Sequence, residues 1–169
     1  MLPRTPQLVS ASRELDGWTL IVGRWCSPID EERSDDVARV CRELSARYGA
    51  AQAYFFGAQN DGSAWLVAER GVIIRRGASD DEGAAGDPGW GIGEPLSFEQ
   101  QERARLTAEG GDVEFEWEFA LLEMAPNLAG ALSINPLEAG ATTSARGRGV
   151  LALTPYGVVH GFPPAALPI

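Results

Sequence analysis

The most regular hydrophobic pattern in the chain is a helical stripe that ends at Gly49. Apolar side chains recur there every three or four residues, as they do along one face of a helix. Ser34 or Asp35 is placed to cap the N-terminus, and Gly49 is placed to end the helix, since glycine favours the left-handed conformation of a C-cap. The pattern therefore predicts a helix whose buried stripe comprises Val37, Val40, Cys41, Leu44 and Tyr48.

Short apolar runs separated by turn residues predict antiparallel strands on both sides of that helix. Residues 18–25 form the first run, and residues 53–56, 64–68 and 72–76 follow the helix. The last three runs are linked by short turns, which makes them neighbours in an antiparallel meander. Because these runs are nearly continuous in apolar residues, we expect a central sheet covered on at least part of both faces. The predicted fold class is α+β, with a mostly antiparallel sheet and two or three helices packed on it.

A loop, a strap and one capping signal organise much of the remaining chain. Residues 77–93 combine glycines with acidic side chains and predict a long surface loop. Residues 161–169 hold three prolines and predict an extended C-terminal strap. Ser97 has capping-box spacing to Gln100, which predicts the start of a surface helix. At 169 residues the chain has the length of one domain, so we expect a single α+β domain over residues 1–169.

The segment from residue 113 to residue 125 supports two interpretations. Over residues 113–118 apolar side chains alternate with glutamates, which predicts a half-buried strand with all three glutamates on one face. The part from Glu116 to Met124 also suits a helix. We expect a strand over residues 113–118 and a helix over residues 119–125, with Pro126 ending either element. The pattern alone leaves open whether the segment is strand, helix or both.

Composition and charge narrow the classes of function. Fourteen arginines and no lysine stand against 24 acidic residues, which gives a formal net charge of −10. Phosphate backbones and anionic lipid surfaces require a basic face, so we expect neither nucleic acid nor a membrane as partner. The use of arginine alone, with abundant glycine and alanine, is typical of a GC-rich bacterial genome. There is no signal-peptide core, and two cysteines are too few for a disulfide framework, so we expect a cytoplasmic protein.

Few residues offer catalytic or metal-binding chemistry. His160 is the only histidine, so it cannot build a multi-histidine metal site, and nothing in the sequence places it beside Cys26 as a nucleophilic pair. The glycines of residues 89–93 lack the preceding strand and following helix of a phosphate-binding loop. The acidic residues of 80–87 lack the alternating spacing of a calcium-binding EF-hand. We therefore expect no enzyme, no cofactor and no bound metal.

Two acidic clusters are the main candidates for a functional surface. One surrounds the start of the predicted helix, and the other is the row of glutamates on the predicted strand. Acidic faces of this kind speed the association of basic partners and discriminate between them. The alternative is a solvated face that only keeps an acidic protein in solution. The candidate residues are Asp30, Glu31, Asp35 and Asp36 in the first cluster and Glu114, Glu116 and Glu118 in the second.

Short motifs in the first half of the chain resemble a known family. Leu44-Ser45-x-x-Tyr48-Gly49 precedes an aromatic strand, and Trp65-x-x-Ala68-x-x-Gly71-x-x-x-Arg75 follows it. Over residues 17–100 this arrangement resembles the small acidic immunity proteins that bacteria encode beside polymorphic toxins. The resemblance implies a non-enzymatic inhibitor that plugs the active site of a toxin domain. The partner would then be a basic protein.

Two other functions stay open at this level. One is an accessory subunit of a larger bacterial assembly, which also needs only a binding face. The other is a small-molecule-binding domain with a pocket beneath residues 77–93. The side chains predicted to line that pocket are Trp65, Arg75 and Trp90. The oligomeric state and the identity of the partner do not follow from the sequence.

Overall fold

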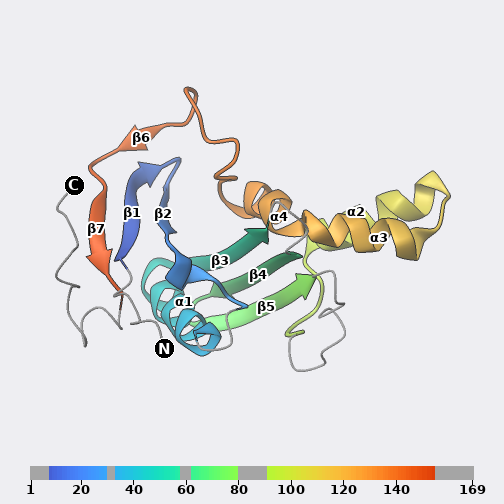
Figure 1. The fold of residues 1–169 in the computed structure, drawn as a ribbon, viewed down its shortest axis with the longest axis horizontal. Helices are drawn as coiled ribbons and strands as arrows, with labels where there is room; N and C mark the ends of the chain where they lie inside the picture. Colours follow the sequence, from blue (N-terminus) through green and yellow to red (C-terminus); the bar gives the residue numbers. More distant parts are fainter. Residues whose placement is uncertain (1–7, 30–32, 58–61, 80–90, 155–169) are drawn as a thin grey trace, which may run out of the picture. The chain divides into compact units, whose positions relative to one another are not determined.

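The computed structural model describes residues 8–29, 33–57, 62–79 and 91–154 (Figure 1). These residues form four α-helices and two antiparallel sheets, which confirms the predicted α+β class. The chain divides into two compact units, one made of Met1–Cys26 with Gly140–Ile169 and the other of Ser27–Ala139. The single domain over residues 1–169 stays a prediction.

The smaller unit is a sheet built around strand β1. Asp16 and Gly17 join β1 to β2 with φ angles of 45° and 86°, the two positive values that a type I′ hairpin turn requires. The predicted first strand ends at Val22 and is followed by a short 3-10 helix. On the other edge of β1 lie two strands from the far end of the chain. The elements are β1 (Leu8–Leu15), β2 (Trp18–Val22), η1 (Arg24–Cys26), β6 (Ala145–Arg146) and β7 (Val150–Leu153).

The larger unit contains the predicted antiparallel meander, with strand order β3-β4-β5. Every residue of β4 from Gly62 to Ala68 is buried, so both faces of this central strand must be covered. Arg70 and Gly71 have positive φ angles and make the two-residue turn into β5. Residues 77–79 continue β5 and do not belong to the predicted loop. The strands are β3 (Ala50–Gly57), β4 (Gly62–Glu69) and β5 (Val72–Ser79).

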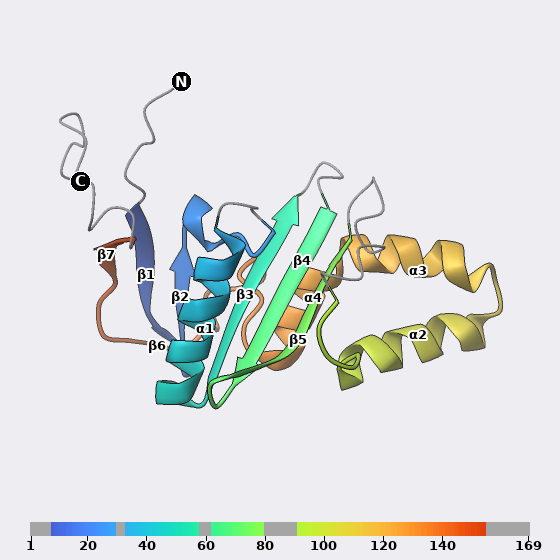
Figure 2. The same ribbon diagram turned by 90° about the horizontal axis from the view of Figure 1, so that it is seen from below.

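Helices α1 (Ser34–Tyr48) and α4 (Met124–Leu132) cover opposite faces of this meander (Figures 1 and 2). On the α4 face, Trp65 and Val67 of β4 pack with Met124 and Leu128 to form the core cluster. Ser63 of β4 also holds the start of α4, because its Oγ accepts the N–H of Ala125 at 2.7 Å. These two helices therefore provide most of the cover on the two faces of the sheet, and Trp117 and Leu121 of the segment before α4 also pack against its core cluster.

Helix α1 confirms the predicted helix and part of its stripe, in which Val40 and Leu44 are half-buried. Val37 and Cys41 are buried, and the N–H of Gly49, at φ 96°, donates to the carbonyl of Ser45. Neither Ser34 nor Asp35 acts as the cap, since both lie inside the helix after the N-cap residue Arg33. The prediction that Tyr48 is buried is wrong. Tyr48 is 68% exposed, and its ring carries the guanidinium of the neighbouring Arg47 at 5.2 Å.

The predicted strand over residues 113–118 is wrong, because this segment belongs to helix α3 (Val113–Leu122). Asp112 caps the helix, with its Oδ1 accepting the N–H of Phe115 at 3.2 Å. Pro126 does not end an element, since it lies in the first turn of α4, where its missing N–H would have had no partner within the helix. The helix predicted after residue 119 is present, divided between α3 and α4.

Helix α2 (Ser97–Glu109) begins at Ser97 itself, the residue predicted as its cap, so the cap lies one residue earlier than predicted. Leu96 is the N-cap residue, and its N–H donates to Glu99 Oε2 at 2.8 Å. Gln100 reaches back instead to the carbonyl of Pro95, at 2.7 Å. The reciprocal half of a capping box is therefore made by a glutamate that the sequence analysis passed over.

Candidate functional site

Helices α2 and α3 lie side by side as a hairpin that extends away from the meander (Figure 2). The sheet covers little of it, for α2 buries only Glu99 and Leu106 and α3 buries no side chain. Residues 97–122 contain seven acidic residues and two arginines. This hairpin therefore carries half of the formal net charge of the whole chain.

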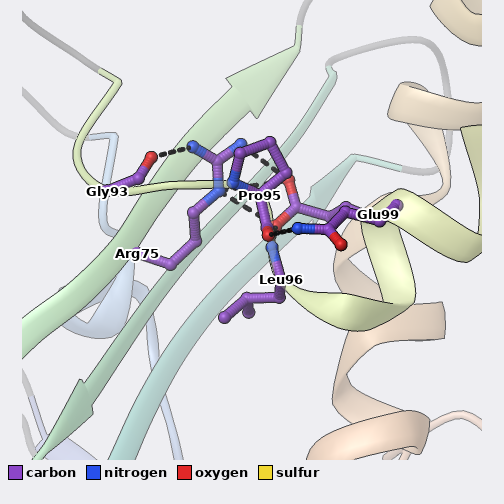
Figure 3. Close-up of polar contacts among 6 residues, drawn as sticks. Arg75, Gly93, Pro95, Leu96 and Glu99 are labelled. Atoms are coloured by element: carbon purple, nitrogen blue, oxygen red, sulfur yellow. Dashed lines mark hydrogen bonds and ion pairs between the residues drawn. The ribbon is translucent and has the colours of Figure 1, made fainter.

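A buried ion pair fixes the base of this hairpin to the sheet (Figure 3). The side chain of Glu99 is 1% exposed and accepts from Arg75 of β5, with Nη2 to Oε1 at 2.6 Å and Nε to Oε2 at 2.9 Å. The third nitrogen, Arg75 Nη1, donates to the carbonyl of Gly93 at 3.0 Å. Two-pronged geometry and these additional hydrogen bonds offset the cost of burying two charges.

Gly93 permits the chain to pass close enough to β5 for this arrangement. Its φ is +75°, and a Cβ atom there would lie 1.9 Å from the carbonyl oxygen of Ile74. The preceding residue, Ile92, makes two backbone hydrogen bonds with Arg76, at 2.9 and 3.1 Å. Only glycine fits where the chain passes this close to β5. The segment that leads into α2 is therefore held to β5 at Ile92, at Gly93 and at the ion pair.

The residues predicted to line a small-molecule pocket have structural roles where the structure describes them. Trp65 is 1% exposed in the core and lies against Gly77, where a Cβ atom would come within 2.5 Å of the indole ring. Arg75 is held by Glu99 and Gly93. Trp90 lies outside the described residues, so the pocket itself stays a prediction.

The described members of the first acidic cluster lie in the first turn of α1. Asp36 Oδ1 accepts from Arg39 Nη2 at 2.8 Å, and Arg39 also reaches Glu43 at 3.4 Å. The Asp36 carboxylate, by its hydrogen bond and its charge, raises the pKa of Arg39 above its usual value. Burial lowers the pKa of Arg76 of β5, and the negative charge of Asp35 partly opposes this shift. This part of the cluster is therefore balanced by arginines of the chain itself; Asp30 and Glu31 lie outside the described residues.

The second acidic cluster does not form a single face. In a helix, Glu116 points about 200° away from Glu114 and Glu118, which are one turn apart. Glu114 Oε1 forms an ion pair with Arg103 Nη2 at 2.7 Å, and the Arg103 guanidinium lies 5.3 Å from the centre of the Trp117 ring. Glu116 instead lines a cleft on another side of the hairpin. The prediction of one common glutamate face is therefore wrong, because the element is a helix.

This cleft lies between α2, α3 and α4 and has a volume of about 230 Å³. Its α2 side is neutralised internally, because Arg105 donates to both oxygens of Glu102, at 2.5 and 3.0 Å, and to Glu109 at 2.6 Å. The hydrogen bond from Arg105 lowers the pKa of Glu102. Its lining residues are Phe98, Glu102, Arg105, Leu106, Glu116, Phe119, Ala120, Glu123, Met124 and Asn127.

The α3 side of the cleft has no such compensation. Glu116, Phe119, Ala120 and Glu123 follow one another at helical spacing along this wall. No arginine in the described part of the chain forms an ion pair with either glutamate. Phe119 is 59% exposed, and its ring packs edge-on against Phe115, 58% exposed, with the ring centres 5.0 Å apart.

A second groove, of about 610 Å³, lies on the other side of the hairpin. The Trp117 ring and the Arg103 guanidinium above it both belong to its lining. This groove therefore already holds a cation of its own. The remaining lining residues are Pro95, Glu99, Gln100, Ala104, Thr107 and Ala108.

Sequence reasoning missed Phe115, Phe119 and Glu123 as surface residues. Interpreting residues 113–118 as a strand assigned Phe115 to a buried face and separated it from Phe119. Their spacing of four residues, read at helical period, places the two rings together and was the available signal.

Comparisons of the chain with protein-family models, with curated proteins and with solved structures find no match. Within residues 8–29, 33–57, 62–79 and 91–154, no three side chains of the histidine, cysteine, aspartate or glutamate type are grouped to hold a metal ion. The helices of this described part are too short or too polar to cross a membrane.

Proposed function

We propose that this chain is a non-enzymatic protein-binding module whose α2–α3 hairpin docks on a basic partner, in the manner of an immunity-type inhibitor of a toxin domain. The observation that carries this proposal is the exposed Phe115–Phe119 pair beside glutamates that no described arginine pairs with. Aromatic anchors within a polar rim are the composition typical of protein–protein interfaces.

A solvated face accounts for the glutamates but not for the phenylalanines. More than half of each phenylalanine side chain is exposed to water, so covering that exposed part would contribute about 1–2 kcal/mol per ring. The neighbouring carboxylates would attract a basic partner from a distance and raise its association rate. Aromatic surface and charge therefore act together on the same approaching protein.

A cytoplasmic, bacterial setting belongs to the same proposal. Neither Cys26 nor Cys41 forms a disulfide, as is usual for proteins of a reducing compartment. The arginine-only composition supports a GC-rich bacterial source.

The test compares proteins captured from a bacterial lysate by the original chain and by a Phe115→Ser/Phe119→Ser variant. Leu137→Ser is the matched control, since Leu137 is 67% exposed but lies outside the hairpin. We expect a basic protein that the original chain and the control retain, that the double variant loses, and that high salt releases. Equal capture by all three would place the docking face elsewhere. An enzymatic activity of the captured protein that the chain leaves unchanged would contradict the inhibitor role.

An apolar face on the smaller unit favours the accessory subunit as a second candidate. Val22 and Leu151 pair with Ser10 from the two neighbouring strands, so they share one face of the sheet. They are 62% and 57% exposed. If this face joins a larger assembly, capture should resist high salt and disappear in a Val22→Ser/Leu151→Ser variant. Salt-sensitive capture by that variant would exclude this second candidate.

A further inference from the structure

We propose that the cleft between α2, α3 and α4 receives one arginine side chain of the docked partner. Its guanidinium would stack on the ring of Phe119 and bind the carboxylate of Glu116 or Glu123. This inference rests on the proposed function and names the chemical group that the hairpin recognises.

The size of the cleft fits a side chain better than a metabolite. Its volume is about 230 Å³, whereas small-molecule sites usually enclose about 300–1,000 Å³. Leu106 and Met124 line the cleft but are almost fully buried, whereas Phe119 of the α3 wall is 59% exposed. An arginine that enters would therefore lay its side chain against the Phe119 ring and keep its charged head at the polar rim.

The α3 wall has the spacing that such a head requires. Glu116 of α3 and Glu123, the C-cap residue of that helix, are seven residues apart, and Phe119 lies between them in the sequence. Ala120 adds only a methyl group beside Phe119, which leaves the wall hollow at that level. The cleft therefore combines an aromatic surface, two carboxylates without a described cation, and space between them.

Arginine fits this wall better than lysine. Its planar guanidinium is weakly hydrated, stacks on aromatic rings and binds a carboxylate with two parallel hydrogen bonds, whereas an ammonium is a strongly hydrated point charge. The hairpin already binds its own arginines in both ways. Arg105 makes two hydrogen bonds with Glu102, and Arg103 lies over the ring of Trp117. The α3 wall offers the same two groups, an aromatic ring and carboxylates, but no arginine of the described residues forms an ion pair with these carboxylates.

The experiment uses the full chain and three short peptides in which a central arginine, lysine or citrulline is flanked by leucines. Citrulline keeps the shape of arginine and removes its charge. Binding is followed by nuclear magnetic resonance, through the backbone amide signals of Glu116 and Phe119. We expect the arginine peptide to shift these signals, the lysine peptide to bind several-fold more weakly, and the citrulline peptide to bind roughly tenfold more weakly, about 1.4 kcal/mol.

Three variants separate the cleft from the overall charge. Glu116→Gln removes a carboxylate from the cleft, and Glu118→Gln removes the same charge from a residue that does not line it. Ala120→Leu fills the hollow without changing any charge. We expect Glu116→Gln and Ala120→Leu to weaken the arginine peptide roughly tenfold. Glu118→Gln should leave it unchanged, and thermal melting should show all three variants folded.

Several outcomes would overturn the inference. If the arginine and citrulline peptides bind equally, the positive charge does not contribute to recognition. If the lysine peptide binds as tightly as the arginine peptide, the cleft does not prefer a guanidinium. Equal losses in Glu116→Gln and Glu118→Gln would mean that only net charge matters. A concentration-dependent dimer that Ala120→Leu abolishes would make a second copy the occupant.

Failure of this inference is distinguishable from failure of the proposed function. If Ala120→Leu keeps the captured basic partner and only Phe115→Ser/Phe119→Ser loses it, the hairpin docks without an arginine in the cleft. If neither variant loses that partner, the docking face itself is wrong.

Discussion

Helices α1 and α3 belong to the same unit, yet they use their apolar side chains in opposite ways. In α1 the apolar residues form one stripe, and the sheet buries Val37 and Cys41. In α3 the apolar residues face every direction, and none of them is buried. A helix whose apolar surface exceeds what its own sheet covers is suited to a second contact, whereas α1 has no apolar surface of this kind beyond Tyr48.

The difference arises from the order in which the sheet is covered. Helices α1 and α4 occupy the two faces of β4, so α3 reaches the core only through Trp117 and Leu121, which are partly buried. Phe115 and Phe119 are offset from these two by half a turn and point away. The same four-residue spacing therefore produces one face that packs and one face that is exposed.

The largest expected effect is at the junction between the hairpin and the sheet. Glu99→Gln leaves the Arg75 guanidinium buried without its counter-ion, which should lower the free energy of unfolding by about 3–5 kcal/mol. Glu102→Gln is the matched control, because its partner Arg105 is half-exposed and exposed ion pairs contribute little to stability. Urea denaturation measures both. Equal losses would contradict the view that the Arg75–Glu99 pair anchors the hairpin.

A smaller loss is expected in α1. Val37 is 3% exposed, so Val37→Ala should lower the free energy of unfolding by about 2 kcal/mol through lost burial and the cavity left behind. The measurement is the urea midpoint at constant slope. A loss below that of an exposed α3 substitution would break the comparison between the two helices.

The partly buried phenol of Tyr54 in β3 gives a pH dependence. Burial, followed by the influence of Cys41, raises the pKa of Tyr54 above its usual value of about 10. The unfolded chain therefore loses this proton first, so stability is complete below about pH 10 and decreases as the pH rises further. By about pH 11 the loss should reach about 1.4 kcal/mol. Denaturation across this range should show that Tyr54→Phe flattens the decrease, and an unchanged slope would contradict the assignment.

The smallest effect on stability is expected in α3. Phe119→Ala removes far more apolar surface than Val37→Ala, but 59% of that side chain is already in water. We expect a change of no more than about 1 kcal/mol in the free energy of unfolding. Urea denaturation should therefore rank Phe119→Ala below Val37→Ala. A loss of about 3 kcal/mol or more, typical of a buried phenylalanine, would show that the ring belongs to the core.

The elements with a single dominant period were predictable from the sequence. The α1 stripe and the meander both follow local rules of spacing and turn chemistry, including the paired positive φ angles of Arg70 and Gly71. Residues 113–122 were not predictable in this way. Glutamates and apolar residues alternate at strand period over the first half of this segment. The helix that forms buries no side chain, so the sequence carries no single apolar stripe at helical spacing.

Long-range contacts had no signal in the sequence at all. Arg75 and Glu99 are 24 residues apart, and Ser63 holds the start of α4 from 62 residues away. Each of these residues is an ordinary member of its own segment. Only the folded chain brings them together. These contacts hold the base of the hairpin and the start of α4, and so the elements that form the cleft.

The most direct test of the docking face compares equal charge reversals on the two helices. One variant carries Glu116→Arg/Glu123→Arg beside the exposed phenylalanines, and the other carries Asp36→Arg/Glu43→Arg on α1. The association rate of the captured basic partner is measured with each by stopped flow. We expect the association rate of the hairpin variant to fall to about one tenth of the original rate or lower. The association rate of the α1 variant should remain close to the original. Equal slowing by both variants would contradict a docking face on α3.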